Sequence, residues 1–599
     1  MNIQRKKQDK LLCVSKKCID LYSTSFLAIM QRRWMYKSLP QPSQIRVLTE
    51  AIHIEEQLAI LLLQRDIADF ESAKAFFRPS LEALHNPFLM KDMDKAVDRL
   101  EQAIASREKI LIYGDYDVDG TTSVALLYGF LHTYHKEINF YLPDRQKEGY
   151  GISPEGIRWA KENGFTLVIA LDCGIKSVEV MEYARELSVD FIICDHHLQG
   201  EVLPNACAIL NPKQANCPYP FKELSGCGIG FKLLQAFCER NQLDINRLYD
   251  FIDLVAVSIA ADLVSMSGEN RILAFYGLQK LNSQPRIGLK ALMEVSGYTA
   301  ESVLSVSNVV FALGPRINAV GRLGHAASAV KLLVAQTKEE ADHYAQLINL
   351  MNTERKDLDA TATQEAIAMV EAEYARGENA SVTILFKADW HKGIVGIIAA
   401  RCIDQFHRPT IVLTESGNMV VGSARSVQGF DLYHALEMCA DLLTQYGGHK
   451  QAAGLSMKLE NLPAFRQRFE QIVRESILPE MLIHGQDIDL KLDVADITPK
   501  FFRILRQMAP FGPDNMRPVF VSENLTAEHI QLLREKHLKF RVRSQRGNTV
   551  FEVVGFGMAH FYQDLREAKT LSLCYTVEEN FFNGKANLQL RAKDMVFVK

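Results

Sequence analysis

The sequence lacks the patterns that mark zinc ribbons, disulfide scaffolds and membrane proteins. Its eleven cysteines include no Cys-x-x-Cys pair, and Cys207, Cys217, Cys227 and Cys238 are spaced too widely for a usual zinc ribbon. We interpret them as reduced thiols of a cytoplasmic protein. No stretch approaches the roughly 20 consecutive apolar residues of a spanning helix, so no membrane association is expected.

A basic surplus and low-complexity tracts are also missing. The formal net charge is −4 over 599 residues. Because nucleic-acid-binding domains usually carry an excess of Lys and Arg, any basic surface of this chain must be local. With 48% apolar residues and no biased segment, the chain is expected to fold into several domains.

Changes of pattern along the chain predict its domains. The lysine-rich start is interpreted as a frayed tail, as a weak targeting segment, or as a start upstream of a true start at Met30. Helical spacing from Glu50 to Phe77 predicts a helical lead-in. The charged stretch from Lys338 to Ala375 has neither Pro nor Gly and predicts one long helix of the kind that bridges domains. The expected divisions are residues 1–30 (tail), 31–85 (helical lead-in), 86–337 (first α/β domain), 338–376 (connecting helix), 377–475 (second α/β domain) and 476–599 (β-barrel).

Short apolar runs alternate with amphipathic helices between Met93 and Ala260, which is typical of a parallel sheet with crossover helices. Ligands of such sheets bind outside the carboxyl ends of the strands. Polar motifs lie at three of these ends: Gly114-Asp-Tyr-Asp-Val-Asp-Gly120, Asp172-Cys173-Gly174 and Asp195-His196-His197. A shared crevice is therefore the expected site of chemistry.

The first motif carries three aspartates at alternating positions, Asp115, Asp117 and Asp119. Carboxylate oxygens are the preferred ligands of hard cations, and neighbouring loop residues can reach two different ions. A calcium loop of the EF-hand type is excluded because it requires a Glu about twelve residues after its first ligand, where this chain has Leu126. The aspartates therefore favour a Mg²⁺ or Mn²⁺ site over a simple loop or helix cap.

The other motifs strengthen this hypothesis only in combination. An aspartate such as Asp172 is by itself more often a turn or cap residue than a metal ligand. Together with His196 and His197 it adds carboxylate and imidazole ligands at the same sheet edge, a mixed set that suits Mn²⁺ and is tolerated by Mg²⁺. Asp262, after a buried apolar run, is either a further carboxylate ligand or the end of a helix.

These motifs, in this order, resemble the DHH superfamily of phosphoesterases. The sequence Gly447-Gly-His449-Lys-Gln-Ala-Ala-Gly454 is similar to the signature of the DHH-associated domain, and Gly314-Pro-Arg-Ile-Asn-Ala-Val-Gly-Arg322 together with the C-terminal barrel resembles the RecJ-type exonucleases. The resemblance implies two α/β domains, DHH and DHH-associated, joined by a long helix around a central cleft, with a C-terminal OB-type β-barrel.

The resemblance also implies a ligand set for two ions, Mn²⁺ or Mg²⁺. Asp117 and Asp172 would hold one ion, and Asp172 would bridge to a second held with Asp119, His196 and Asp262. Many relatives have a histidine where this chain has Tyr113, which leaves the first ion's ligand set open, with Asp115 as a further candidate. The catalytic set comprises Asp117, Asp119, Asp172, His196, Asp262 and His197, the last beside the scissile phosphate as a phosphate contact or proton donor.

Substrate contacts are expected outside the acidic cluster. Arg145 can pair with a phosphate and Tyr150 can stack on a base; an ordinary exposed loop is the alternative. The resemblance raises a further set as phosphate-binding and 5′-end-sensing candidates, each of which alone is as typical of surface or interdomain ion pairs. This set comprises Arg316, Arg322, Arg401, Arg425, Ser426 and His449.

Two further segments have competing interpretations. Gly226-Cys-Gly-Ile-Gly230 lacks the spacing of a dinucleotide fingerprint and the ending of a P-loop, so we interpret it as a helix entry. Lys539, Arg541 and Arg543 alternate with apolar residues, which places the basic side chains on one strand face. That strip is either a groove for single-stranded nucleic acid or a solvated edge strand.

The resulting hypothesis is a 5′→3′ exonuclease specific for single-stranded DNA, acting in recombination and repair. The expected partners are single-stranded DNA with a 5′ end and, beyond it, a single-strand-binding protein and a helicase; the protein itself is expected to be a monomer. The alternatives are a phosphodiesterase for oligoribonucleotides or cyclic dinucleotides, and a non-catalytic DNA-binding scaffold.

Overall fold

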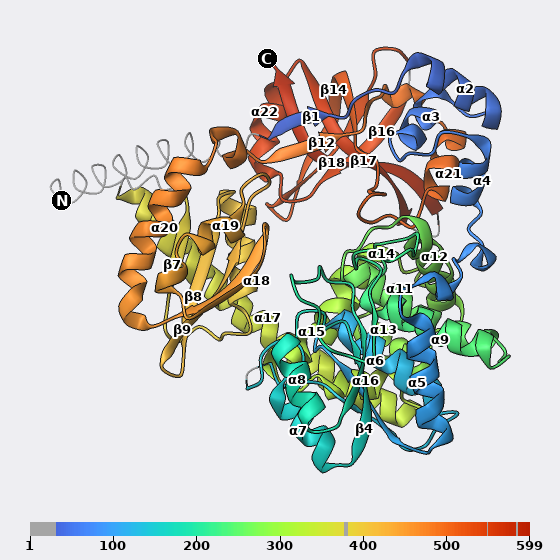
Figure 1. Cartoon of the computed structure of the whole chain (residues 1–599). Helices are drawn as coiled ribbons and strands as arrows, with labels where there is room; N and C mark the ends of the chain where they lie inside the picture. The colour runs from blue at the N-terminus through green and yellow to red at the C-terminus, as the bar shows by residue number, and fades with distance from the viewer. Residues whose placement is uncertain (1–31, 146, 377–380, 548, 583–584) are drawn as a thin grey trace. The chain divides into compact units, whose positions relative to one another are not determined.

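The computed structural model describes residues 32–145, 147–376, 381–547, 549–582 and 585–599. The expected tail, residues 1–30, lies outside this range. The chain forms two compact units, which are described separately (Figure 1). Unit 2 comprises Ser38–Glu354 and Leu492–Pro518, and unit 1 comprises the N-terminal segment up to Lys37, Arg355–Lys491 and Val519–Lys599.

Unit 2 is built on a five-stranded parallel sheet in the order β3-β2-β4-β5-β6. The predicted strands and crossover helices are confirmed, although α6 begins earlier than expected, directly after Asp117. The elements are β2 Lys109–Gly114, α6 Val118–Leu131, β3 Ile138–Tyr141, α7 Pro154–Glu162, β4 Phe165–Leu171, α8 Val178–Glu186, β5 Asp190–Cys194 and β6 Ala208–Leu210.

Helices cover both faces of this sheet because alternate strand residues point to opposite sides. Leu111 and Val168 pack against α7 and α8 in one apolar core. Ile110 and Ile169 belong to a larger core on the other face, which also includes α5, α6, α9 and α11. The other helices of this region are α5 Met93–Ala105, α9 Gly226–Arg240, α10 Asn246–Tyr249, α11 Ile252–Ala261, α12 Gly268–Ser283, α13 Ile287–Val295, α14 Val306–Asn308, the π-helix η3 Val309–Leu313, α15 Gly314–Leu323 and α16 Ala327–Leu333.

The helical lead-in predicted for the N-terminal segment is present as three short helices. They are α2 Pro42–Ile52, α3 Glu56–Leu63 and α4 Phe70–Phe77, divided because His53 adopts a left-handed conformation after α2 and Asp69 caps α4. Before them, β1 Arg33–Tyr36 is a strand that pairs with β12 Gly485–Ile488. The first described residues of the predicted range, 31–85, are therefore not helical.

The predicted long helix is present with the expected ends, because α17 spans Lys338–Ala375. The division between the two units falls inside it, between Glu354 and Arg355. The domain boundaries expected from the sequence stay predictions. No helix within the described residues is long and apolar enough to span a membrane.

Unit 1 contains a five-stranded mixed sheet in the order β10-β11-β9-β8-β7, with only β7 and β8 parallel. Helix α19 ends at Glu437, and a 3-10 turn follows at Ala440–Leu442. The elements are β7 Thr383–Phe386, α18 Val395–Phe406, β8 Thr410–Ser416, β9 Met419–Arg425, α19 Leu432–Glu437, β10 Gln445–His449, β11 Ala452–Met457 and α20 Leu462–Ser476.

The predicted barrel is present and closes through the pairing of β14 with β17. Its strands are β13 Leu490–Lys491, β14 Phe520–Leu533, β15 His537–Arg543, β16 Val550–Gly555, β17 Thr570–Phe582 and β18 Lys585–Val598, and a last helix, α22, spans Tyr562–Glu567. Residues 492–518, which include α21 Pro499–Gln507, belong instead to unit 2. The buried Arg271 guanidinium holds them there by donating to the carbonyl oxygens of Met508, Ala509 and Pro510.

Candidate metal centre

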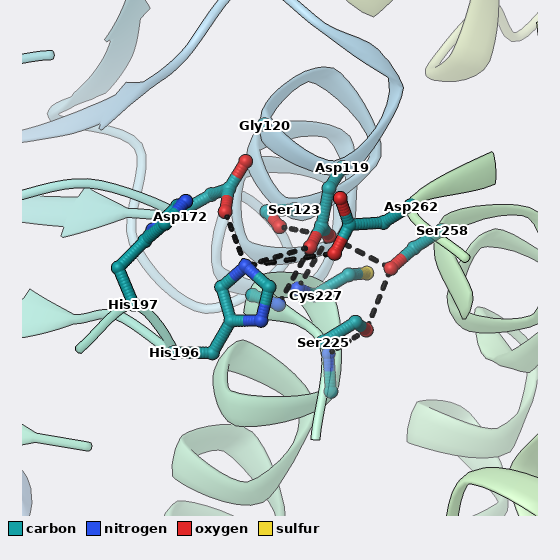
Figure 2. A network of polar contacts seen from close by, with 12 residues as sticks. Asp119, Gly120, Ser123, Asp172, His196, His197, Ser225, Cys227, Ser258 and Asp262 are labelled. Atoms are coloured by element: carbon teal, nitrogen blue, oxygen red, sulfur yellow. Dashed lines mark hydrogen bonds and ion pairs between the residues drawn. The ribbon is translucent and has the colours of Figure 1, made fainter. Parts of the chain in front are cut away.

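Acidic and imidazole side chains from four separate segments of unit 2 meet at one edge of the parallel sheet (Figure 2). The His196 Nε2 atom lies 3.2 Å from Asp172 Oδ1, 3.6 Å from Asp262 Oδ2 and 3.9 Å from Asp119 Oδ2. These residues follow β5, β4 and α11 and open α6. The sequence-based expectation that these four side chains converge is thus confirmed.

Asp119 is fixed by donors that sequence reasoning did not identify. Its carboxylate accepts hydrogen bonds from the backbone N–H groups of Gly226, at 2.7 Å, and Cys227, at 2.8 Å, and from the Ser258 hydroxyl, at 2.7 Å. The N-terminus of α9 therefore faces this carboxylate, where free N–H groups and the helix dipole stabilise negative charge. The glycine-rich segment was interpreted as a helix entry, which is correct, but it also holds a candidate ligand.

Asp172 adopts an uncommon left-handed backbone conformation, with φ of +60°, directly after β4. Apart from the His196 imidazole beside Asp172, the buried Oδ1 atoms of Asp172 and Asp115 have no hydrogen-bond partner among the described residues. Burial and the neighbouring carboxylates, Asp119 for Asp172 and Asp117 for Asp115, raise the pKa of both groups well above its usual range. Buried carboxylate oxygens without a donor are a costly arrangement that a bound cation relieves.

Asp117 and Asp262 complete the acidic set. Asp117 caps α6 by accepting a hydrogen bond from the Gly120 N–H at 3.1 Å, and its pKa is raised by burial and by Asp119. Burial and the charges of Asp119 and Asp117 raise the pKa of Asp262 to about 9. This accumulation of negative charge fits divalent cations held by oxygen ligands and one imidazole.

Potential ligand atoms lie close enough together for metal binding in two groups that share His196. One group is Asp119, His196 and Asp262, and the other is Asp172, His196 and His197; within each group the atoms lie within 4.8 Å of one another. Neither group includes Asp115 or Asp117, whose contribution stays a prediction. Burial lowers the pKa of His196, which favours the neutral imidazole that binds metals.

His197 is oriented by Asp195, a residue that was not among the predicted site residues. The Asp195 carboxylate accepts hydrogen bonds from His197 Nδ1, at 2.7 Å, and from the backbone N–H groups of His197 and Ile175. Burial disfavours a charged His197, but the bond to Asp195 outweighs it and raises the pKa of the imidazole. His197 is thereby suited to carry a proton next to the cluster.

Two predicted substrate contacts, Tyr150 and Arg145, lie beside the same edge. The exposed Tyr150 ring donates through its hydroxyl to the Asp172 carbonyl oxygen, at 3.1 Å, and packs edge-on against His197 and Tyr116. The Arg145 guanidinium lies 5.1 Å from the centre of the Tyr116 ring. Tyr116, which was not among the predicted site residues, therefore contacts both Tyr150 and Arg145.

Helix α15 places the next two candidates. It packs directly against the aspartate loop, because a Cβ atom on Gly321 would lie 2.5 Å from the Tyr116 carbonyl oxygen. Arg322 lies in the last turn of this helix. Its positive charge opposes the rise in the pKa of Tyr116 that burial and Asp115 cause. Arg316 donates to Asn349 Oδ1 and to the Ala312 carbonyl oxygen.

Three candidates of unit 1, Arg425, Ser426 and His449, lie at one end of its sheet. Arg425 and His449 flank Ala452, which pairs with both across neighbouring strands. His449 is exposed, whereas the buried Ser426 hydroxyl donates to the Val427 and Phe430 carbonyl oxygens. Arg401 on α18 pairs with Asp359 at 3.1 Å and keeps 56% of its side chain exposed.

The predicted alternation in the barrel is confirmed, since Leu538 and Val542 are buried between the basic residues of β15. Those basic residues have acidic partners, which the sequence did not indicate: Glu552 pairs with Lys539 and Arg541, and Glu528 pairs with Arg543.

Phe556, an aromatic residue that was not among the predicted site residues, lies exposed on the same barrel. Phe556 is 57% exposed, with Arg591 5.2 Å from its ring centre and the His537 ring edge-on at 5.4 Å. An exposed ring beside a guanidinium group suits a stacked base better than basic residues that are already paired with glutamates do.

Comparison with known families agrees with this geometry. Three family models match the chain: the DHH family N-terminal domain over residues 109–259, the DHHA1 domain over residues 379–475 and the RecJ OB domain over residues 488–594. The parallel sheet with its acidic edge, the second sheet and the barrel thus define a protein of the DHH class.

The single-stranded-DNA-specific exonuclease RecJ of Bacillus subtilis is 38% identical over 567 residues, which cover 94% of this chain and 70% of the relative. Two crystal structures of RecJ from Thermus thermophilus share the fold. The complex with Mn²⁺ has a TM-score of 0.82 at 27% identity and the complex with Mg²⁺ one of 0.75 at 26%; each match covers 95% of this chain and about four fifths of the other, 80% and 79%. The chain belongs to the RecJ family.

Proposed function

We propose that this chain is a metal-dependent exonuclease that hydrolyses phosphodiester bonds of single-stranded DNA from its 5′ end, using two Mn²⁺ or Mg²⁺ ions. The observation that carries the proposal is the convergence of Asp119, Asp172, His196 and Asp262 on one sheet edge. A relative 38% identical, named as an exonuclease of this specificity, supports the substrate class.

The residues divide into two ligand sets. Asp117 and Asp172 would hold one cation, and Asp119, His196 and Asp262 would hold the other together with Asp172. Asp115 supplies a further buried carboxylate beside the first set. When bound, the two cations supply Lewis-acid activation of a water molecule and neutralise the charge on the leaving oxygen.

The remaining groups bind and orient the DNA. His197, held by Asp195, contacts the scissile phosphate or delivers a proton to the leaving oxygen, because its pKa is raised and its Nε2 atom faces Tyr150. Tyr150 offers an exposed ring for a base, and Arg145 offers a guanidinium for a phosphate. Arg316 and Arg322 lie on the helix that packs against the aspartate loop.

Unit 1 contributes further DNA contacts in this proposal. Arg401, Arg425 and His449 bind phosphates near the 5′ end, and Ser426 stabilises the turn after Arg425. On the barrel, Phe556 stacks on a base, while Lys539, Arg541 and Arg543 attract the backbone in competition with their glutamate partners.

A monomeric state, a cytoplasmic location, a role in recombination and repair, and association with a single-strand-binding protein and a helicase complete the proposal. The family relationship alone supports these four points, and no contact among the described residues bears on them.

End-labelled substrates test the proposal. Wild-type protein and Asp172→Asn are incubated with Mn²⁺ or Mg²⁺ and with single-stranded DNA labelled at either end, duplex DNA, short RNA or a cyclic dinucleotide. The expected result is early release of the 5′ label from single-stranded DNA, lost in the variant and in EDTA. Early release of the 3′ label or equal attack on duplex contradicts the polarity or strand preference. Preference for RNA or cyclic dinucleotide selects the alternative phosphodiesterase, and DNA binding without hydrolysis selects a scaffold.

A further inference from the structure

A fourth strand end contributes to the metal edge, and it carries a lysine. Strand β6 runs parallel to β5, with Leu210 opposite Cys194, and the Leu210 carbonyl oxygen accepts a hydrogen bond from the Asp195 N–H at 3.0 Å. The residues after β6 therefore leave the sheet beside the Asp195-His196-His197 motif. Lys213 comes two residues after Asn211 in this segment.

The backbone around Lys213 is fixed to the histidine motif. The fully buried Asn211 donates from Nδ2 to the His197 carbonyl oxygen at 2.8 Å and accepts from the Lys213 N–H at 2.8 Å. Gln214 donates from Nε2 to the Ile209 carbonyl oxygen at 2.6 Å. A loop held in this way keeps the Lys213 Cα in one place relative to the metal edge.

The Lys213 side chain is mostly buried, with 20% of its surface exposed, and it pairs with the half-exposed Glu223 at 3.1 Å. Glu223 lies three residues before Gly226, whose N–H group holds the Asp119 carboxylate. Lys213 therefore lies between the loop of the histidine motif and the segment that leads into α9.

The pairing with Glu223 leaves the lysine available for exchange. An ion pair with an exposed partner is weak, because water solvates the carboxylate well. A phosphate oxygen bound at a cation-rich site makes a stronger, charge-assisted contact. Replacing Glu223 by a phosphate thus costs little and requires movement of the ammonium end only.

We propose that Lys213 binds a non-bridging oxygen of the scissile phosphodiester beside the histidine motif of the metal edge, releasing Glu223 as the DNA enters. The proposal rests on the proposed exonuclease function and adds a substrate-binding residue to it. The competing interpretation is that the Lys213–Glu223 pair only ties its loop to the segment that precedes α9.

Three variants separate the two interpretations: Lys213→Met, Glu223→Gln and the charge exchange Lys213→Glu/Glu223→Lys. If Lys213 binds phosphate, Lys213→Met lowers kcat/KM on single-stranded DNA about 10- to 100-fold, and Glu223→Gln keeps or raises it. The charge exchange fails to restore activity although it restores an ion pair. If the pair is only a tie, both single variants lose activity equally and the exchange restores it, which overturns the proposal.

A binding measurement without turnover completes the test. The affinity of a 5′-phosphorylated oligonucleotide is titrated in EDTA over a range of salt concentrations, with thermal unfolding to verify folding. Loss of one phosphate contact in Lys213→Met makes the slope of log K against log salt shallower by about 0.7; an unchanged slope and affinity overturns the proposal. Absence of exonuclease activity in the wild type would instead refute the proposed function, and the binding arm would still report on Lys213.

Discussion

Substitution of Gly226 by alanine tests how the cluster is positioned without removing any ligand. A Cβ atom at Gly226 would lie 2.7 Å from Asp172 Cβ and 3.0 Å from its Cα and Oδ1 atoms. Carbon atoms in contact prefer about 3.5–4.0 Å, so Asp172 or the start of α9 has to move by roughly 1 Å. Either movement separates Asp172 from Asp119, which the Gly226 and Cys227 N–H groups hold.

A displacement of about 1 Å at a catalytic centre lowers the rate by roughly a hundredfold. We therefore expect Gly226→Ala to reduce kcat on single-stranded DNA by that factor and to weaken Mn²⁺ binding, measured by steady-state kinetics and calorimetry. Gly228→Ala is the matched control in the same helical turn, because its Cβ would meet Leu224 and Ser225 at an ordinary 3.4 Å. Wild-type activity in Gly226→Ala, or an equal loss in Gly228→Ala, would refute the reasoning.

Further predictions concern the proton-carrying histidine, the metal affinity and the barrel. Asp195→Asn is expected to lower kcat about 10- to 100-fold with little change in Mn²⁺ affinity. Because loss of the Asp195 charge lowers the pKa of His197, the alkaline fall of the pH–rate profile moves to lower pH. An unmoved profile argues against a proton-carrying role of His197. The pKa of Asp262 is raised to about 9 in the folded, metal-free protein and is about 3.9 in the unfolded chain. Because the folded state binds this proton more tightly, the free energy of unfolding of the metal-free protein falls as the pH rises between these two values. Metal binding displaces this proton, so Mn²⁺ affinity measured by calorimetry rises up to about tenfold per pH unit below 9, and Asp262→Asn flattens this dependence; a pH-independent wild type contradicts it. Phe556→Ala is expected to weaken oligonucleotide binding about 5- to 150-fold, the equivalent of about 1–3 kcal/mol per stacked base. Val550→Ala, at the start of the strand β16 that ends just before Phe556, leaves the affinity unchanged in fluorescence anisotropy; equal effects of the two would exclude a stacking role.

The sequence predicted the ligand cluster because its residues follow strands whose direction is readable from apolar runs. Asp115, Asp172 and His196 lie directly after β2, β4 and β5 or one residue later, and parallel strands bring their carboxyl ends together. The donors to Asp119 could not be predicted, because the approach of Gly226 depends on the packing of α9 against α6. Likewise, the glutamate partners of Lys539 and Arg543 depend on strand register.

Strand β14 was not predicted because its pattern is interrupted. Its pairing with β17 shifts register between Ser522 and Leu525, and its pairing with β15 shifts between Glu528 and Gln531. Asn524 and His529 adopt positive φ at these two places. Each bulge moves the following side chains to the other face, which removes the alternation by which a strand is identified.

Manganese titration followed by electron paramagnetic resonance tests the metal centre most directly. The account predicts two bound Mn²⁺ per chain with a spin-coupled spectrum, as expected for ions roughly 3.5–4 Å apart, and loss of the coupling in Asp172→Ala. Fewer than two bound ions, or the spectrum of isolated ions in the wild-type protein, would contradict the account.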